Sequence, residues 1–269
     1  MVALDTLGII AGNGVYPRLL AQAARRAGVK RIIAAAFADE TDDRLAGMVD
    51  GIEWMRVGQL GKLIGCFRNA SVANAIMAGQ IAPKNLFDLR PDWKMLLLLA
   101  RLKRRNAESI FAAIGDELAR AGVTLLSATS FLEDCLAPNG LVAGRKLNHR
   151  QEEDVAFGFE IAREVSRLDI GQTVIVKNGT VLAVEGFEGT NEAIKRGGAL
   201  ARKDAVMVKV AKPTQDMRFD VPVIGVATVD VAAAAQVRVI AIEAGRTLLL
   251  EKEAVIEQAN RANISIVAL

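Results

Sequence analysis

Apolar runs alternate with amphipathic stretches through the first half of the chain. Short, strongly apolar runs predict strands at 7–11, 32–37, 72–77 and 123–126. Helical periodicity lies between them, for example over 18–27, where Gly28 is a suitable stop, and over 109–120. Strands that alternate with helices form parallel sheets covered on both faces. The pattern therefore predicts an α/β fold that starts with a Rossmann-like N-terminal domain containing a parallel sheet.

The pattern changes after a segment rich in turn residues, 134–144. A helix is expected beyond it over 151–165, and the Asn-Gly pair at 178–179 is typical of a hairpin turn between two strands. Further strands are expected at 205–210, 223–228, 237–243, 247–250 and 265–268, with a helix over 252–262. The predicted organisation is domain 1–133, linker 134–144 and an α/β domain with a mixed sheet, 145–269.

Composition narrows the function classes. The chain has 34 basic and 31 acidic residues, a near balance that argues against a nucleic-acid partner. Cys66 and Cys135 have no metal-binding or disulfide-framework spacing, which fits a reducing cytoplasm. No apolar run of about 18 residues and no signal-like start are present, so neither secretion nor a membrane span is expected. With a single histidine, His149, in a basic loop, catalysis is expected to use carboxylates, cations and backbone amides.

Residues 210–225 concentrate charged side chains just before an apolar run. Asp216 and Asp220 are suitable ligands for a shared divalent cation, because Mg²⁺ prefers carboxylate oxygens. Lys212 and Arg218 carry the charges that bind phosphate oxygens. The alternative is a solvated turn with a surface ion pair, which gives the same cluster of charges.

Two loops are candidate anion sites. Gly12, Asn13 and Gly14 separate an expected strand from a helix, where amides and the helix dipole favour an anion. A dinucleotide fingerprint would need a third glycine where Pro17 stands, although Asp39 or Glu40 lies where a ribose-binding acid is expected. A tight turn is the alternative.

The second candidate loop spans 185–192. Here Thr190 is a candidate N-cap of the next helix and Glu185 a candidate metal ligand, with an ordinary capped helix as the alternative.

The stretch 93–105 joins a dense apolar patch that starts at Trp93 to a basic end. An amphipathic helix lying at a membrane surface has this composition, and so does a core helix with a solvated terminus. It is too short to span a bilayer.

Five motifs together resemble one protein family, and this resemblance covers nearly the whole chain. They lie at 8–17, 77–81, 184–190, 212–225 and 244–247. In this order they resemble the LpxI-type UDP-2,3-diacylglucosamine pyrophosphatases of Gram-negative lipid A synthesis. The segment 212–225 is the most specific of the five.

The resemblance implies hydrolysis of UDP-2,3-diacylglucosamine to UMP and 2,3-diacylglucosamine 1-phosphate, with Mg²⁺ or another divalent cation and the substrate held between two domains. Water would attack the phosphorus that the sugar carries. The expected catalytic residues are Asp220, Asp216 and Arg218, and the expected metal ligands are Asp220, Asp216 and Glu185. The expected substrate-binding residues are Gly12, Asn13, Gly14, Gly79, Gln80, Thr190 and Lys212.

A diacylated substrate also implies peripheral contact with the cytoplasmic face of the inner membrane, to which the stretch 93–105 is suited. A homodimer is expected by family analogy alone. Two other functions stay open from the residues: an NAD(P)-dependent oxidoreductase built on the Gly12 loop, and a regulatory nucleotide-binding module in which residues 216–220 only brace a hinge.

Overall fold

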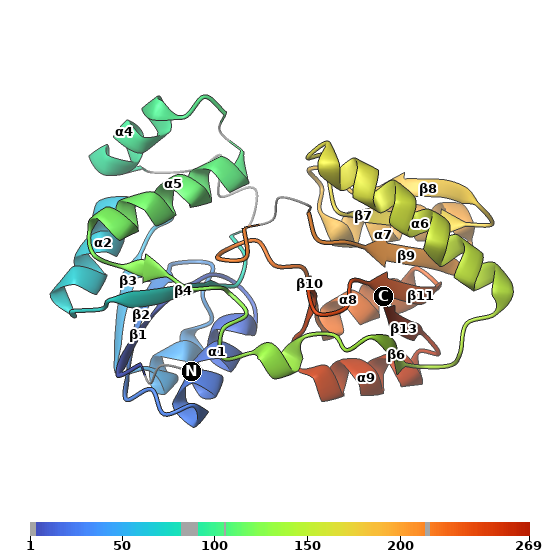
Figure 1. The fold of residues 1–269 in the computed structure, drawn as a ribbon, viewed down its shortest axis with the longest axis horizontal. Coiled ribbons are helices and arrows are strands. Elements are labelled where there is room, and N and C mark those ends of the chain that lie inside the picture. Colours follow the sequence, from blue (N-terminus) through green and yellow to red (C-terminus); the bar gives the residue numbers. More distant parts are fainter. Residues whose placement is uncertain (1–3, 82–90, 105, 213–215) are drawn as a thin grey trace. The chain divides into compact units, whose positions relative to one another are not determined.

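The computed structural model describes residues 4–81, 91–104, 106–212 and 216–269. They form two compact units, each with its own sheet (Figure 1). Unit 1 contains Met1–Leu132 and Met217–Asp220, and unit 2 contains Glu133–Asp216 and Val221–Leu269. Arg105 of the stretch 93–105 and residues 213–215 of the charged segment lie outside the described residues.

Unit 1 is built on a five-stranded parallel sheet in the order β3-β2-β1-β4-β5. Its strands are β1 (Thr6–Ala11), β2 (Arg31–Phe37), β3 (Gly51–Met55), β4 (Asn74–Ala78) and β5 (Thr124–Leu125). Its helices are α1 (Tyr16–Arg26), η1 (Asp43–Met48), α2 (Leu60–Asn69), α4 (Trp93–Arg101) and α5 (Ala107–Arg120). The predicted Rossmann-like parallel sheet is confirmed. Strand β3 was not predicted, because its residues are mostly half-buried and give no apolar run.

Unit 2 contains a six-stranded mixed sheet in the order β6-β13-β11-β9-β7-β8 and a short two-stranded sheet, β10-β12. Its strands are β6 (Gly140–Ala143), β7 (Thr173–Lys177), β8 (Thr180–Val184), β9 (Ala205–Lys209), β10 (Val223–Ile224), β11 (Val237–Ile242), β12 (Leu248–Leu249) and β13 (Ser265–Ala268). Its helices are η2 (Glu133–Cys135), α6 (His149–Arg167), α7 (Thr190–Ala201), α8 (Val226–Ala234) and α9 (Lys252–Arg261). The predicted mixed-sheet α/β domain and its Asn-Gly hairpin are confirmed.

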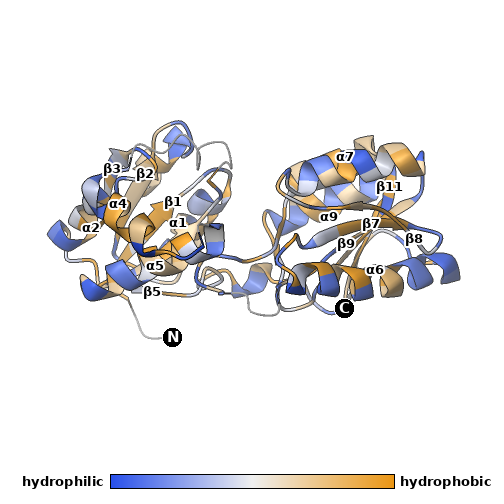
Figure 2. Cartoon of the chain, turned by 90° about the horizontal axis from the view of Figure 1, so that it is seen from above, coloured by the Kyte–Doolittle hydropathy of each residue, from blue (hydrophilic) through white to orange (hydrophobic). Residues whose placement is uncertain are grey.

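Side chains that alternate along the strands of unit 2 serve two cores. Val206 and Val208 of β9 pack with Phe159 of α6 on one face of the sheet. Met207 of the same strand packs on the other face with α7, α8 and α9, which contribute Ile194 among others. Helices α6 and α7 show alternating hydrophobic and hydrophilic colours in Figure 2, as expected for helices with one buried side. The large sheet is therefore covered on both faces.

Three predictions about unit 2 need correction. The expected linker 134–144 contains strand β6. This strand pairs antiparallel with β13 and forms one edge of the large sheet. The expected strand 223–228 stops at Ile224, and helix α8 begins after Gly225. Its valines and alanines pack against α7 and α9, so tertiary burial outweighs the strand preference of β-branched residues. Finally, Met217–Asp220 belongs to unit 1 rather than to the C-terminal domain predicted at 145–269.

Candidate functional site

Two loops cross at the carboxyl edge of the unit 1 sheet, directly after β1 and β4. The amide of Gly12 donates to the carbonyl of Ala78 at 2.8 Å. Asn13 and Gln80 exchange backbone hydrogen bonds at 2.7 and 3.3 Å and form an isolated antiparallel bridge. In sheets with this strand order, the carboxyl edge between β1 and β4 is where ligands bind. The structure thus brings four predicted substrate-binding residues, Gly12, Asn13, Gly79 and Gln80, to one place.

The glycines of these crossing loops are required by the backbone itself. A Cβ on Gly12 would lie 2.5 Å from the carbonyl oxygen of Gln80, and a Cβ on Gly79 would lie 2.5 Å from that of Asn13. The amides of Asn13 and Gln80 donate to each other's carbonyls, so the crossing uses them. The groups left to contact a ligand are therefore the exposed side chains of Asn13 and Gln80, together with Gly14 just before α1.

The acid after β2 is Glu40. Its side chain is buried, and Asn13 Nδ2 donates to its Oε2 at 3.4 Å, whereas Asp39 is exposed. The neighbouring Thr41 hydroxyl donates to the Ala11 carbonyl and accepts the amide of Phe37 at 2.9 Å. The loop after β2 is thereby tied to the end of β1, and Glu40 faces the crossing loops.

Residues 217–220 attach to the exit of β5 in unit 1. The Met217 carbonyl accepts the Ala128 amide at 2.7 Å and the Ser127 hydroxyl at 3.3 Å. The buried Tyr16 hydroxyl donates to the carbonyl of Ala128, which links α1 to the same exit. The loops after β1, β4 and β5 leave one edge of the parallel sheet, so residues 217–220 join the edge that carries the crossing loops.

Aromatic packing secures this segment. The rings of Phe219 and Phe111 of α5 lie 5.8 Å apart, and Phe219 packs against the unit 1 core. The guanidinium of Arg218 lies 5.8 Å from the Phe219 ring and reaches α5 at Gly115. Arg218 and Asp220 are both half-buried. Two of the three predicted catalytic residues, Arg218 and Asp220, therefore belong to unit 1, whereas Asp216 belongs to unit 2.

Unit 2 carries a buried polar chain at the carboxyl ends of β8 and β9. Lys209 Nζ donates to the Thr190 hydroxyl at 2.7 Å, and that hydroxyl donates to Glu185 Oε1 at 2.7 Å. Lys209 is 5% exposed and Glu185 is 8% exposed. We call these three residues the Lys209 chain. Lys209 was missed in the sequence, although a lysine at the end of the apolar strand 205–209 is a recognisable signal, because lysine is rarely buried without a partner.

Three buried polar atoms beside this chain have no hydrogen-bond partner: Oε2 of Glu185, Oγ1 of Thr173 and Oε1 of Gln172.

The N-cap of α7 is Gly189, with a φ of 84°, and Thr190 is the first helical residue, so the predicted N-cap is wrong. The single hydroxyl proton of Thr190 goes to Glu185. Thr190 therefore uses its one proton inside this group and has none left to donate to a substrate.

The loop between Glu185 and Thr190 folds around the carboxylate of Glu188. This carboxylate accepts the Gly186 amide at 3.0 Å and is paired with Arg196. Its hydrogen bonds, first with its own backbone amide and then with Arg196, lower its pKa. The loop is thus held in shape by a charged group at neutral pH.

A second polar cluster of unit 2 surrounds Glu243, at the end of β11. Its Oε2 accepts the Ala211 amide at 2.9 Å, and Arg163 and Arg246 lie 3.6 and 3.8 Å from its oxygens. Arg246 also donates to the carbonyl of Lys212 at 3.4 Å. Glu243 and the two arginines were not predicted as site residues. A charged residue directly after an apolar strand was again the available signal.

Lys212, predicted to bind substrate, is also placed by this part of unit 2. Its Nζ is 2.7 Å from Asp169 Oδ1, in an ion pair just beyond α6. Three cationic side chains, those of Arg163, Lys212 and Arg246, therefore gather around the strand exit at 210–212.

The three predicted metal ligands are divided between the two units. Among the described residues, no three His, Cys, Asp or Glu side chains are grouped so that they could hold a metal ion. Glu185 belongs to unit 2, where Thr190 uses one of its oxygens, and Asp220 belongs to unit 1. The carboxylates of Asp216 and Asp220 have the right donor chemistry for Mg²⁺, which usually takes one or two protein carboxylates and completes its shell with substrate phosphates and water.

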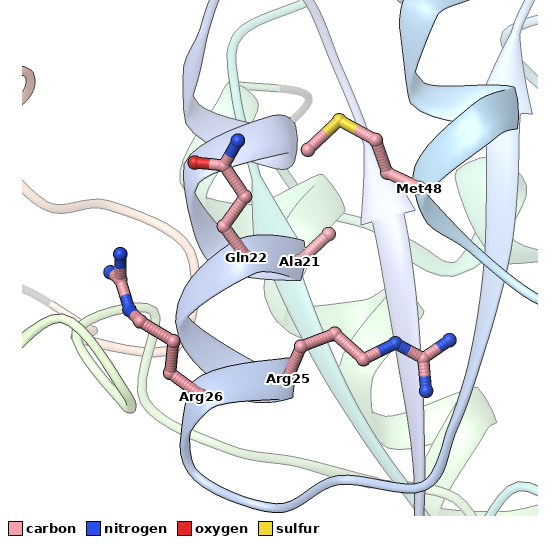
Figure 3. Close-up of a pocket in the computed structure, with 5 residues that line it drawn as sticks. All are labelled: Ala21, Gln22, Arg25, Arg26 and Met48. Atoms are coloured by element: carbon pink, nitrogen blue, oxygen red, sulfur yellow. The ribbon is translucent and has the colours of Figure 1, made fainter.

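Two other polar features of unit 1 are structural. A hollow of about 500 Å³ is lined by Ala21, Gln22, Arg25, Arg26 and Met48 (Figure 3). It lies along the second half of α1, where Arg25 donates to the carbonyl of Val29 at 3.1 Å. In a parallel α/β unit the end of such a helix lies toward the amino edge of the sheet, opposite the ligand-binding edge. We therefore do not assign the function to this hollow.

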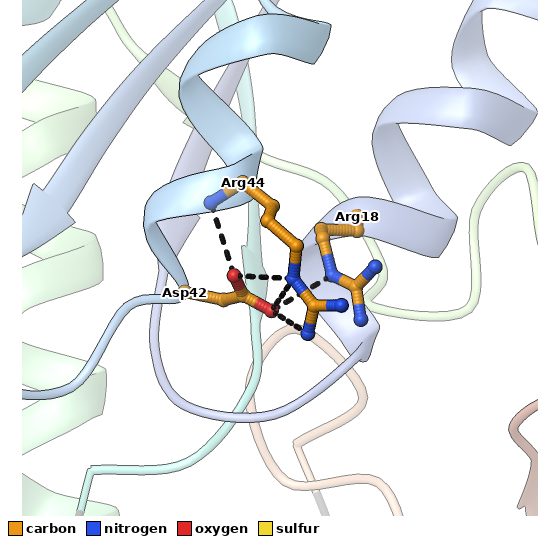
Figure 4. A network of polar contacts seen from close by, with 3 residues as sticks. All are labelled: Arg18, Asp42 and Arg44. Carbon is orange, nitrogen blue, oxygen red and sulfur yellow. Dashed lines mark hydrogen bonds and ion pairs between the residues drawn. The ribbon is translucent and has the colours of Figure 1, made fainter.

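Asp42 is the centre of the second feature, shown in Figure 4. It caps η1 by accepting the Arg44 amide at 3.0 Å, and it pairs with the guanidinium groups of Arg44 and Arg18. The hydrogen bonds from Arg44 lower the pKa of Asp42 to about 2. This network stabilises the turn that follows β2.

Together, the fold and its polar edges define a two-unit α/β protein whose first unit has the Rossmann-like strand order used for nucleotide ligands. Residues 6–135 match the model of the LpxI N-terminal domain, and residues 138–267 match that of the LpxI C-terminal domain. The chain therefore belongs to the LpxI family. It is 32% identical over 278 aligned residues to the UDP-2,3-diacylglucosamine pyrophosphatase LpxI of Caulobacter vibrioides. The alignment covers 98% of this chain and 97% of the relative.

Proposed function

We propose that this protein hydrolyses the pyrophosphate bond of UDP-2,3-diacylglucosamine and releases 2,3-diacylglucosamine 1-phosphate (lipid X) and UMP, in lipid A biosynthesis. The observation that carries the proposal is the match, over nearly the full length of both chains, to a relative whose name states this activity. A nucleotide portion suits the Rossmann-like unit, and a negatively charged pyrophosphate suits cationic side chains such as Arg218 and Lys212.

In the proposed reaction, Arg218 and Lys212 bind phosphate oxygens and offset the charge that develops as the anhydride opens. Asp220 orients a water molecule and takes its proton. The water oxygen forms a bond to the phosphorus that carries the sugar, the bond from that phosphorus to the bridging oxygen breaks, and UMP leaves with the bridging oxygen. The side chains of Asn13 and Gln80 contribute substrate contacts from the crossing loops.

We propose Asp216 and Asp220 as the ligands of Mg²⁺, with the substrate's phosphates as further ligands. When bound, the ion would stabilise the negative charge of the pyrophosphate and of the departing UMP. Glu185 is the weakest member of the predicted set, because one of its oxygens already accepts the Thr190 hydroxyl. A Glu185→Gln variant should therefore reduce the affinity for Mg²⁺ less than Asp216→Asn does.

The decisive experiment is turnover of UDP-2,3-diacylglucosamine in ¹⁸O-labelled water, with Mg²⁺ or with EDTA, followed by mass analysis of both products. We expect metal-dependent turnover with the label in the lipid phosphate. Asp220→Asn should lower kcat by at least about a thousandfold. The matched control is Asp230→Asn on α8, whose carboxylate accepts Gln258 Nε2 at 2.6 Å on the protein surface. Label in UMP would overturn the direction of attack.

Absence of turnover in every condition would reject the pyrophosphatase. Nucleotide binding without turnover would then favour the regulatory module, and binding of NAD(P)H would favour the oxidoreductase. Wild-type turnover by Asp220→Asn would reject the role of Asp220 alone.

We further propose that the protein works in the cytoplasm, in peripheral contact with the inner membrane, and as a homodimer. Acyl chains of a diacylated substrate favour residence at a lipid surface. Sedimentation of the full chain tests the dimer, for which we expect twice the mass of one chain.

A further inference from the structure

Helix α4 has one buried face and one apolar face turned to solvent. Met95 and Leu98 are buried in the unit 1 core. Trp93, Leu96 and Leu97 are exposed by 66%, 54% and 46%. These three residues and the exposed Ala100 follow the i, i+3, i+4, i+7 spacing of one helix side. We call this side the apolar face of α4.

The apolar face belongs to a well-anchored helix. Asp92 caps α4 by accepting the Met95 amide at 2.9 Å. Its other carboxylate oxygen accepts the Gly61 amide of α2 at 2.6 Å, which ties the start of α4 to its neighbour. The exposed side chains are therefore presented by a fixed element and not by a fraying end.

Exposed large apolar residues are concentrated on this helix. Nine such residues occur in the described part of the chain, and three of them lie within five positions of α4. The others are Leu141, Leu168, Ile170, Phe187, Leu200 and Leu269. Single exposed apolar residues are ordinary, but a group on one rigid surface marks an interaction site.

The charges beside this face select the kind of partner. Arg101, Lys103 and Arg104 are exposed at its C-terminal end, and residues 93–104 include no aspartate or glutamate. Because the whole chain has a net charge of only +3, this basic end is a local feature. An apolar stripe with a tryptophan and adjoining cations is the composition of a helix that lies in the interface of an anionic bilayer.

We propose that the apolar face of α4 is the membrane-docking surface of this protein. Trp93, Leu96 and Leu97 enter the interfacial region, and the three basic residues pair with anionic headgroups. The nine-residue helix lies in the plane of the membrane surface. In the described part of the chain, no helix has the length and hydropathy to cross a bilayer. The benefit of such docking rests on the proposed function, since it brings the enzyme to a diacylated substrate.

Vesicle flotation of the full chain tests the surface. Vesicles of phosphatidylethanolamine and phosphatidylglycerol are compared with phosphatidylcholine vesicles at low and high salt. We expect wild-type protein to float with the anionic vesicles, and high salt to reduce the bound fraction. A variant with Trp93→Ser, Leu96→Ser and Leu97→Ser should bind at least about tenfold more weakly. A variant with Arg101→Glu, Lys103→Glu and Arg104→Glu should bind about a hundredfold more weakly.

The matched control replaces three equally exposed apolar residues of unit 2, by Leu168→Ser, Ile170→Ser and Leu200→Ser, and should float like wild type. Failure of wild type to float at low salt, or equal losses in control and α4 variants, would overturn the proposal. So would dimer loss in the serine variant without loss of flotation, which would make this face a contact between copies.

Two further measurements keep the outcomes distinct. In a Trp54→Phe background Trp93 is the sole tryptophan, and its emission should shift to the blue with anionic vesicles; an unchanged spectrum contradicts insertion. Turnover of detergent-dispersed substrate should be equal in wild type and the serine variant, whereas turnover of vesicle-embedded substrate should fall in the variant. Flotation without turnover rejects the proposed function alone, and turnover without flotation rejects the docking surface alone.

Discussion

The two units place polar groups at the carboxyl edge of a sheet by different means. In unit 1 the loops after β1 and β4 pair through their backbones, at a separation that only Gly12 and Gly79 permit. In unit 2 the corresponding edge is held by buried ionisable side chains, those of Lys209, Glu185 and Glu243. The position of the first edge is therefore controlled by steric contact, and that of the second by hydrogen bonds to buried ionisable side chains.

This difference teaches which changes each edge tolerates. A backbone crossing accepts new side chains at its exposed positions but no added methyl group at its glycines. A buried charge network accepts changes of shape more readily than the loss of one partner, because the remaining charge stays buried without compensation. Lys209→Met and Gly79→Ala test this distinction directly.

The largest expected effect on stability is in unit 2. Lys209→Met removes the donor to Thr190 and leaves the Glu185 carboxylate buried, so the free energy of unfolding should fall by about 4 kcal/mol. Urea unfolding followed by circular dichroism measures this loss. The control Lys195→Met, in an exposed ion pair with Glu192, should cost less than about 0.5 kcal/mol. Adding Glu185→Leu to Lys209→Met should recover part of the loss, and strict additivity would refute the Lys209 chain as a unit.

The next effect contrasts two glycines of unit 1. Gly79 and Gly14 have the same φ of 90°. A Cβ added at Gly79 would lie against backbone atoms, whereas one added at Gly14 would meet no atom. Gly79→Ala should reduce the free energy of unfolding by about 3 kcal/mol, and Gly14→Ala by about 1 kcal/mol from backbone strain alone. Thermal and urea unfolding of both variants give the comparison. Equal losses would show that the crossing is not sterically controlled.

Phe219→Ala tests whether residues 217–220 depend on unit 1. Loss of the ring contact with Phe111 should lower the free energy of unfolding by about 1 kcal/mol. Turnover should fall by about tenfold, since Arg218 and Asp220 lose their support. Phe187→Ala, at an exposed position of unit 2, is the control and should leave both quantities close to wild type. Unchanged turnover in Phe219→Ala would separate this segment from catalysis.

The smallest effect concerns pH. The folded-state pKa of Asp42 is about 2, below its ordinary value of 3.8. Its stabilisation is therefore present above about pH 4 and is lost as the pH falls toward 2. Asp42→Asn should flatten the dependence of the unfolding midpoint on pH in this window, by an amount that shrinks in high salt because the carboxylate is partly exposed. A wild-type pH profile in the variant would contradict this assignment.

Much of this protein was determined by local sequence. Alternation of apolar runs and helical periodicity defined the parallel sheet of unit 1, because a strand buried on both faces has to be apolar throughout. The Asn-Gly pair defined the β7–β8 hairpin, since this pair readily adopts positive φ. Five ordered motifs indicated the family, and the charged segment 212–220 supplied the candidate catalytic residues.

Only the tertiary structure decided how these pieces are used. Residues 226–234 form a helix because α7 and α9 bury it, against the strand preference of its valines. Met217–Asp220 pack on unit 1 although their neighbours on both sides belong to unit 2, because Ala128 and Phe111 provide the partners. Gly12 and Gly79 meet across 67 residues of sequence, and Lys209 meets Thr190 across 19. Such contacts depend on strand order and register, which no local pattern encodes.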